Sequence, residues 1–293
     1  QTPATHPTSL PTSQTPGRPW QEPTAQVDLK MTGRFRGRHP LPSPPAQSRS
    51  RTINIGIDFG TSATKVCARA ALGYGGDVDT HALHLDGSQS GEHGFLCPST
   101  LAIQDGRLYF GFEAERHRGL GATVFDHLKI CIACPAERKG RSLPGCHSVN
   151  REKRSCDGVF RFLPGDERYG VLARELATLF LSWVMRQSRE LLPYELTGPE
   201  PAGFTYNIGV PLDQLQQSSP LREAYRKMTF DAWCLSTGVE QGLPLARGLA
   251  WIEQLHPREL PDLGHSTVQL CPELGAALVA FVASPRTRPG MYG

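Results

Sequence analysis

Residue types suited to phosphate chemistry are concentrated in one short stretch, "NIGIDFGTSATKV" at residues 54–66. A phosphate-binding turn needs backbone N–H groups directed into one concavity, and glycine permits this because it lets the chain approach closely. Hydroxyl side chains donate hydrogen bonds to phosphate oxygens, and a carboxylate holds Mg²⁺, usually through water. An ordinary tight hairpin is the alternative, since Asp and Thr also satisfy local backbone groups. The candidate residues are Asp58, Gly60, Thr61, Ser62 and Thr64.

The elements around this stretch are predicted to be strands. Apolar residues alternate with polar or glycine residues from Ile53 to Phe59, which is the period of a strand with one buried face. A returning strand is predicted at 64–70, and Leu83 and Leu85 indicate a third short strand. Residues 99–111 are typical of a hairpin around Asp105-Gly106. The core is therefore expected to begin with a strand meander.

Helices and further strands follow in the second half. The apolar stripe in residues 171–192 predicts an amphipathic helix. Residues 204–211 alternate like a half-buried strand, and Ser219-Pro220 predicts the start of a helix that runs to about Leu235. Residues 266–281 are expected to form a strand and then a helix from near Glu273. The predicted fold class is α/β.

The first 51 residues differ in composition from the rest of the chain. They are rich in Pro, Ser and Thr, their second half is basic, and they have almost no apolar periodicity. Such a stretch cannot bury enough surface to offset its ordering entropy. We therefore expect a disordered tail at 1–51 and a folded domain at 52–293.

Charge and hydropathy argue against two classes of partner. The net charge is only +3, which does not indicate a nucleic-acid-binding protein. The longest apolar run, at 275–283, is too short to cross a bilayer. Because no secretory signal is recognisable, most of the eight cysteines are expected to be reduced thiols in the cytoplasm.

The stretch "IGIDFGTSATKV" resembles the first phosphate motif of the actin, heat-shock chaperone and sugar-kinase superfamily. Later segments are similar, in the same order, to the 70-kDa heat-shock chaperone (DnaK-like) branch. These segments are "CPSTLAI…GRLYFGFEAE", "TVFDHLKI", "FTYNIGVPLD" and "PELGAALVAF". The resemblance covers roughly residues 53–293 and implies the first lobe of an actin-like (ribonuclease H-like) ATPase.

This resemblance implies a role for each matched residue. Asp58 would hold hydrated Mg²⁺, Lys129 would neutralise charge developing on the γ-phosphate, and Glu273 would help to position Mg²⁺ and the attacking water. These roles suit phosphoryl transfer, which depends on positioning and charge stabilisation. The implied ligands are ATP or ADP with Mg²⁺. The residues that would cradle the β- and γ-phosphates are Gly60, Thr61 and Ser62, with Thr64 on the same hairpin.

The sequence departs from the family pattern in two residues. Lys129 lies one residue further from Phe125-Asp126 than the usual family lysine, so an exposed helix lysine is its alternative interpretation. Leu274 stands where the family has proline, and Glu273 would alternatively be a first-turn acid favoured by the helix dipole.

Several parts of the family pattern are not recognisable. These are the second Asp-Gly-Gly phosphate turn, the adenosine-binding segment of the other lobe, and the C-terminal peptide-binding domain. We therefore expect a first lobe that is truncated before the second phosphate motif, either a fragment or a degenerate relative. ATP hydrolysis is expected only where a full-length parent completes the cleft. A client polypeptide or co-chaperone would bind through the missing C-terminal part.

Other functions stay open from the sequence. A carbohydrate kinase or an actin-like filament protein of the same superfamily would share the opening hairpin, and "GTSATK" with Lys65 suits such kinases. A zinc-stabilised interaction module is a different class, because Cys131, Cys134, Cys146 and Cys156 offer enough ligands for tetrahedral zinc. A non-enzymatic scaffold is the remaining alternative.

Overall fold

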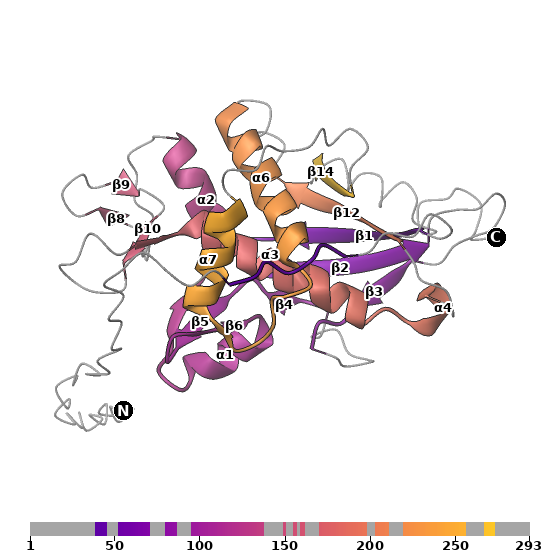
Figure 1. Ribbon diagram of the computed structural model, residues 1–293, viewed down its shortest axis with the longest axis horizontal. Helices are drawn as coiled ribbons and strands as arrows, with labels where there is room; N and C mark the ends of the chain where they lie inside the picture. The colour runs from indigo at the N-terminus through magenta and orange to yellow at the C-terminus, as the bar shows by residue number, and fades with distance from the viewer. Residues whose placement is uncertain are drawn as a thin grey trace, which may run out of the picture. The chain divides into compact units, whose positions relative to one another are not determined.

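The computed structural model describes residues 39–45, 52–70, 80–86, 95–137, 149–150, 155–156, 159–161, 170–197, 203–210, 219–255 and 267–272. The chain divides into two units, Gln1–Lys30 and Met31–Gly293, and every described residue belongs to the second unit. This unit is mixed α/β (Figure 1).

A six-stranded mixed sheet forms the centre of the described domain, with strand order β14-β12-β1-β2-β3 and with β4 paired to β2 (Figure 1). Strand β2 runs antiparallel to its two neighbours β1 and β3, whereas β12 and β14 run parallel to β1. The expected meander is therefore confirmed, and the parallel strands extend it on one side. The strands are β1 (Thr52–Phe59), β2 (Ala63–Ala70), β3 (His81–Leu83), β4 (Cys97–Pro98), β12 (Gly203–Val210) and β14 (Val268–Pro272).

Two long helices, α3 (Ala173–Glu190) and α6 (Ser219–Leu235), pack against each other, and their apolar residues form one core with those of the sheet (Figure 1). Every second residue of β1 is buried, as the alternation predicts. Arg189 joins helix to strand, since its guanidinium donates to the Tyr206 hydroxyl at 2.7 Å and to the Ser236 carbonyl at 2.8 Å.

A second, four-stranded sheet has the order β13-β6-β5-β7. Its central hairpin turns at Asp105-Gly106, where both residues have positive φ, which confirms the predicted turn. Aromatic rings on α3 connect the two sheets: Phe180 packs against Phe59 of β1, and Trp183 stacks on Phe110 of β6. The strands are β5 (Leu101–Gln104), β6 (Arg107–Phe110), β7 (Thr123–Phe125) and β13 (Leu243–Pro244).

Shorter elements complete the described chain. Two small antiparallel pairs are β8 with β9 and β10 with β11. No described helix is both long and apolar enough to cross a membrane. The remaining elements are α1 (Phe112–Arg118), α2 (Leu128–Glu137), α4 (Tyr194–Thr197), α7 (Leu245–Leu255), β8 (Val149–Asn150), β9 (Ser155–Cys156), β10 (Val159–Arg161) and β11 (Gly170–Leu172).

Residues 39–45 differ from the expected disordered tail. Leu41 packs against the core, and Trp251 of α7 donates its indole N–H to the Pro40 carbonyl at 3.0 Å. These residues are ordered because they contact the domain, including Trp251 of α7. A contact with a distant helix cannot be predicted from the apolar periodicity of the stretch itself. The other residues of 1–51 lie outside the described residues.

Candidate functional site

The turn between β1 and β2 is held in a tight conformation by its own backbone. Gly60 donates its N–H to the Asp58 carbonyl at 3.0 Å. A Cβ atom on Gly60 would lie 2.2 Å from the Ala63 carbonyl oxygen, so no other residue fits this position without movement of the backbone. Among the described residues, neither Thr61 nor Ser62 donates its N–H to a backbone carbonyl. Ser62 is exposed and Thr61 is half-buried.

Asp58 and Lys65 lie opposite each other in the β1–β2 ladder. The Lys65 ammonium donates to Asp58 Oδ2 at 3.1 Å, and the two side chains are 45% and 43% exposed. An ion pair with this exposure contributes little to stability, about 0–1 kcal/mol. The pair therefore places one carboxylate and one ammonium beside the turn, both accessible to a solute.

Thr64 faces the opposite side of the strand from Asp58 and Lys65. It is fully buried, and its hydroxyl forms a hydrogen bond of 2.8 Å with the Ser99 hydroxyl. Ser99 also donates its backbone N–H to the Ser62 carbonyl at 3.0 Å. In this structure Thr64 thus supports the turn from inside the domain, whereas Gly60, Thr61 and Ser62 form its outer surface.

The carboxyl ends of three parallel strands meet beside this turn. Asp58 of β1 pairs with Gly209 of β12, and Gly209 pairs with Cys271 of β14. In open α/β sheets, ligands bind outside the carboxyl ends of the strands. Glu273 lies outside the described residues; in the sequence it follows Pro272, the last residue of β14.

Lys129 lies in the first turn of α2 and is only 7% exposed, so its alternative interpretation as an exposed helix lysine is wrong. Just before the helix, His127 adopts a left-handed conformation with φ 58°, and its carbonyl accepts the N–H groups of Ile130 and Cys131. A non-glycine residue in this region is uncommon. His127 therefore redirects the chain where α2 begins.

A charged network connects the start of α2 to the second sheet. Asp126 Oδ1 accepts hydrogen bonds from Thr100 at 3.1 Å and from Arg118 at 2.7 Å. Arg118 also binds Glu115 through two hydrogen bonds. Burial by itself would raise the pKa of Asp126, but the bonds from Arg118 and Thr100 outweigh it, so this pKa lies below its ordinary value. Thr100 is the sequence neighbour of Ser99, whose hydroxyl contacts Thr64 below the turn.

Five of the described cysteines, Cys67, Cys97, Cys131, Cys234 and Cys271, are not part of a disulfide. Burial raises the pKa of Cys97 to about 12 and also raises the pKa of Cys67 and Cys271. Thiols of this kind stay protonated at neutral pH.

The predicted zinc ligands are only partly described. Cys131 is buried in α2, as expected for a small thiol on a helix face, and Cys134 lies on the same helix. Cys156 lies on β9, and Cys146 falls outside the described residues. Among the side chains that the structure describes, no three His, Cys, Asp or Glu residues come together as a metal site.

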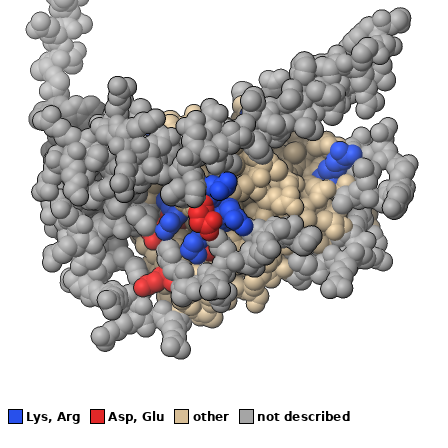
Figure 2. Space-filling view, turned by 90° about the horizontal axis from the view of Figure 1, so that it is seen from above, with Lys and Arg blue, Asp and Glu red and all other residues tan. Residues whose placement is uncertain are grey.

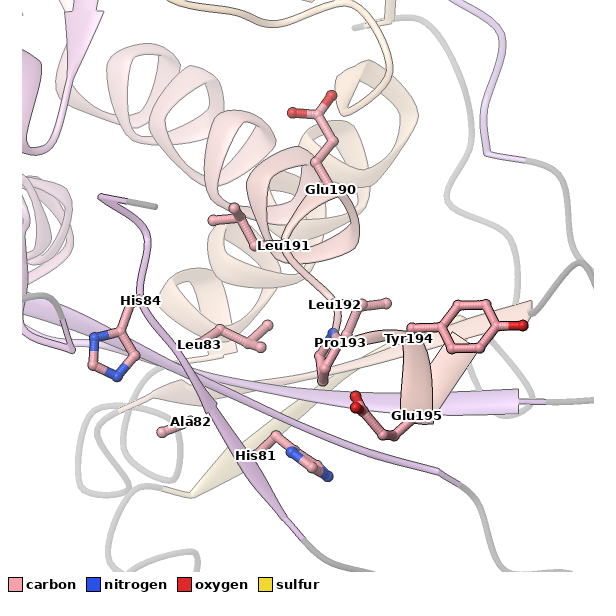
Figure 3. Close-up of a pocket in the computed structure, with 10 residues that line it drawn as sticks. All are labelled: His81, Ala82, Leu83, His84, Glu190, Leu191, Leu192, Pro193, Tyr194 and Glu195. Atoms are coloured by element: carbon pink, nitrogen blue, oxygen red, sulfur yellow. The ribbon is translucent and has the colours of Figure 1, made fainter. Parts of the chain in front are cut away.

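A cavity of about 540 Å³ lies between β3 and the end of α3 (Figure 3). Its volume is in the range of ligand pockets. None of the predicted site residues lines it, and His81 pairs with Ala68, at the far end of β2 from the turn. Figure 3 shows the carboxylates of Glu190 and Glu195 at different parts of the cavity, and Glu190 is already paired with Arg186.

The surface charges of the described residues are mixed in sign. Figure 2 shows Lys or Arg side chains standing beside Asp or Glu side chains in one group on the face that it displays. On α6, Lys227 pairs with Asp231 at 3.2 Å and Arg226 with Glu223 at 3.7 Å.

Two contributors to the site were not identified as such from the sequence. The sequence indicates Lys65 only as a feature of sugar kinases, and Ser99 only as part of the chaperone-like segment "CPSTLAI". The pairing of Asp58 with Lys65 could have been predicted from the sequence, because each lies three residues outside the Thr61-Ser62 centre of the hairpin. The contact of Thr64 with Ser99 could not have been predicted from the sequence, since 35 residues separate them.

Comparison with known proteins gives no family to which the chain can be assigned. No model of a protein family matches it, and no curated protein matches it. The likeness to the heat-shock chaperone branch thus stays an interpretation of the sequence motifs.

Proposed function

We propose that the β1–β2 turn binds the phosphates of ATP together with Mg²⁺, and that the chain is the first lobe of a heat-shock-70-like, actin-like ATPase. One observation carries this proposal: a tight turn, in which the N–H groups of Thr61 and Ser62 bind no backbone carbonyl of the described residues, lies next to the accessible Asp58 carboxylate, at the carboxyl edge of parallel strands. Backbone N–H groups and a carboxylate are the two groups that a magnesium–phosphate ligand needs.

The two charged residues beside the turn have complementary tasks in this proposal. Asp58 holds Mg²⁺ through water, and Lys65, which pairs with Asp58 in the free protein, moves to a phosphate oxygen when the cation arrives. Ion pairs of this exposure separate at small energetic cost, about 1 kcal/mol or less. Gly60 keeps the turn narrow, and Thr64 with Ser99 keeps it rigid.

The residues for hydrolysis are Lys129 and Glu273. The left-handed His127 supports the assignment of Lys129, because it supplies a bend at the place where this sequence has one more residue than the family pattern. Lys129 neutralises the γ-phosphate, and Glu273, which follows Pro272 in the sequence, positions the water. Hydrolysis belongs to a full-length parent in which a second lobe closes the cleft, and it drives a conformational change of that parent.

The proposed setting is cytoplasmic. The described cysteines that form no disulfide are compatible with a reducing compartment. The proposed partners beyond the nucleotide are a client polypeptide or a co-chaperone, which would bind outside the described residues.

Calorimetric titration of the whole chain with ATP, with and without Mg²⁺, tests the proposal. Micromolar binding that requires Mg²⁺, about −8 kcal/mol, is the expected result. Asp58→Asn should remove the Mg²⁺ dependence, and Lys65→Met, a matched change on the other side of the pair, should weaken binding but keep that dependence. A folded chain that binds no ATP, or an Asp58→Asn variant with unchanged Mg²⁺ dependence, would contradict the proposal.

A further inference from the structure

Residues 39–45, "HPLPSPP", which we name the proline segment, lie against α7 and the end of α6 (Figure 1). Three side chains of the domain donate hydrogen bonds to three of its carbonyls. Trp251 donates to Pro40 at 3.0 Å, Gln254 to His39 at 3.0 Å, and Thr237 to Ser43 at 2.6 Å. The domain thus supplies donors only, to a segment that has few N–H groups of its own.

The sequence of the proline segment favours one conformation. Each residue from His39 to Pro44 is either a proline or precedes one. Proline fixes φ near −65°, and the residue before it is restricted to extended or polyproline II backbone. Polyproline II has three residues per turn and no internal hydrogen bonds, so its carbonyls are free to accept. The segment therefore loses little conformational entropy when it binds.

The burial of the proline segment follows a period of three. His39, Pro42 and Pro45 are half-buried, and Leu41 is half-buried beside them. The residues between them, Pro40, Ser43 and Pro44, are exposed. One side of the segment therefore faces the domain along its whole length, as expected for a polyproline II ligand in a groove.

The surface of the domain is shaped for a proline ring. A Cβ atom on Gly238 would lie 2.9 Å from Pro42 Cβ and 3.1 Å from Trp251 Cη2. Glycine at this position therefore leaves the space that the Pro42 ring occupies. Trp251 is 6% exposed and combines an apolar ring with an N–H donor, the pairing that proline-rich segments meet in their recognition grooves. We name Thr237, Gly238, Trp251 and Gln254 the docking surface.

We propose that the docking surface is a recognition site for proline-rich polypeptides in polyproline II conformation, and that the proline segment occupies it as an intramolecular ligand. Only residues 46–51 separate the segment from β1. A linker this short gives an effective concentration in the millimolar range, so a partner at micromolar concentration binds only when the segment is released. This inference does not rest on the proposed nucleotide site.

Competition in the full-length chain tests it. The probe is a fluorescein-labelled synthetic peptide with the sequence of residues 37–47, and its anisotropy reports binding. A chain with Leu41→Ser and Pro42→Gly, which releases the segment, should bind the peptide at least about tenfold more tightly than the unmodified chain. Adding Gly238→Ala or Trp251→Phe to the released chain should reverse this gain, the first by filling the Pro42 position and the second by removing the N–H donor.

A second measurement follows the Trp251 indole N–H by NMR in ¹⁵N-labelled full-length chain, with Trp251→Phe to assign the signal. The signal should shift in the released chain and return on addition of the peptide, but not on addition of a peptide with Pro42→Asp. A released chain that has an unchanged circular dichroism spectrum but binds no more peptide than the unmodified chain would overturn the proposal. Binding that survives both Gly238→Ala and Trp251→Phe would also overturn it. An unmodified chain that is dimeric, and becomes monomeric on release, would overturn the intramolecular arrangement.

Discussion

The two faces of β1 have different tasks. Ile53, Ile55 and Ile57 face α3 and α6 and are at most 2% exposed. Asn54 and Asp58, on the other face, make polar contacts with Thr205 and Lys65 and stay partly accessible. The inward face supplies hydrophobic stability, and the outward face holds polar groups near solvent. The comparison teaches that the proposed site adds little stability and depends on the rigid inner face for its shape.

The largest loss of stability is expected from a substitution on the inward face of β1. Ile55→Ala should lower the free energy of unfolding by about 3 kcal/mol, because it removes buried methyl groups and leaves a cavity. Its neighbour on the outward face, Asn54→Ala, should cost about 1 kcal/mol or less. Urea unfolding of both variants measures the difference. Equal losses would mean that the two faces do not differ as described.

A substitution in the β1–β2 turn should lower the free energy of unfolding by an intermediate amount. Gly60→Ala should cost about 2 kcal/mol, since the new methyl group meets the Ala63 carbonyl and forces the backbone to move. It should also abolish ATP binding if the turn is the phosphate site. Gly106→Ala is the matched control: a Cβ atom there meets open space and only the positive φ is strained, at a cost of about 1 kcal/mol with ATP binding kept. A fully stable Gly60→Ala chain would contradict the geometry.

Substitutions of Thr64 and Ser62 distinguish a residue that supports the turn from one that contacts the ligand. Thr64→Val should cost about 1.5 kcal/mol, because the buried Ser99 hydroxyl loses its partner. Exposed Ser62→Ala should change stability by less than about 0.5 kcal/mol. Calorimetric ATP titration should show the reverse order, with the larger loss of affinity in Ser62→Ala. The same order in both measurements would make Thr64 a ligand after all.

The smallest loss of stability is expected from a substitution in the charged network beside α2. Because the folded-state pKa of Asp126 is lowered, its stabilisation is present above the unfolded pKa and is lost as pH falls through the folded pKa. Asp126→Asn should therefore cost about 1 kcal/mol at pH 7 and progressively less below about pH 4. Asp105→Asn, in an exposed turn, should stay within about 0.5 kcal/mol at each pH. Urea unfolding across this pH range measures both, and a loss that does not depend on pH would contradict the assignment to the Asp126 charge.

Local patterns predicted most of the elements correctly. The alternation in 53–59, the Asp105-Gly106 turn, the stripe of α3 and the Ser219-Pro220 start of α6 are all present in the structure. Helix α7 was not predicted. The proline segment was assigned to a tail, since a short proline-rich stretch has no amphipathic period of its own and gains its order from Trp251, more than two hundred residues away.

The sequence by itself determined the β1–β2 hairpin, because strand alternation, a glycine at the turn and the spacing of Asp58 and Lys65 are all local properties. It also determined the polyproline II preference of the proline segment, since proline restricts its own backbone and that of its neighbour. Only the tertiary structure decided that Thr64 is an interior support, that Lys129 is buried and that the proline segment has a docking surface. Each of these depends on contacts between segments far apart in the chain, and neither propensity nor periodicity encodes which distant surfaces meet.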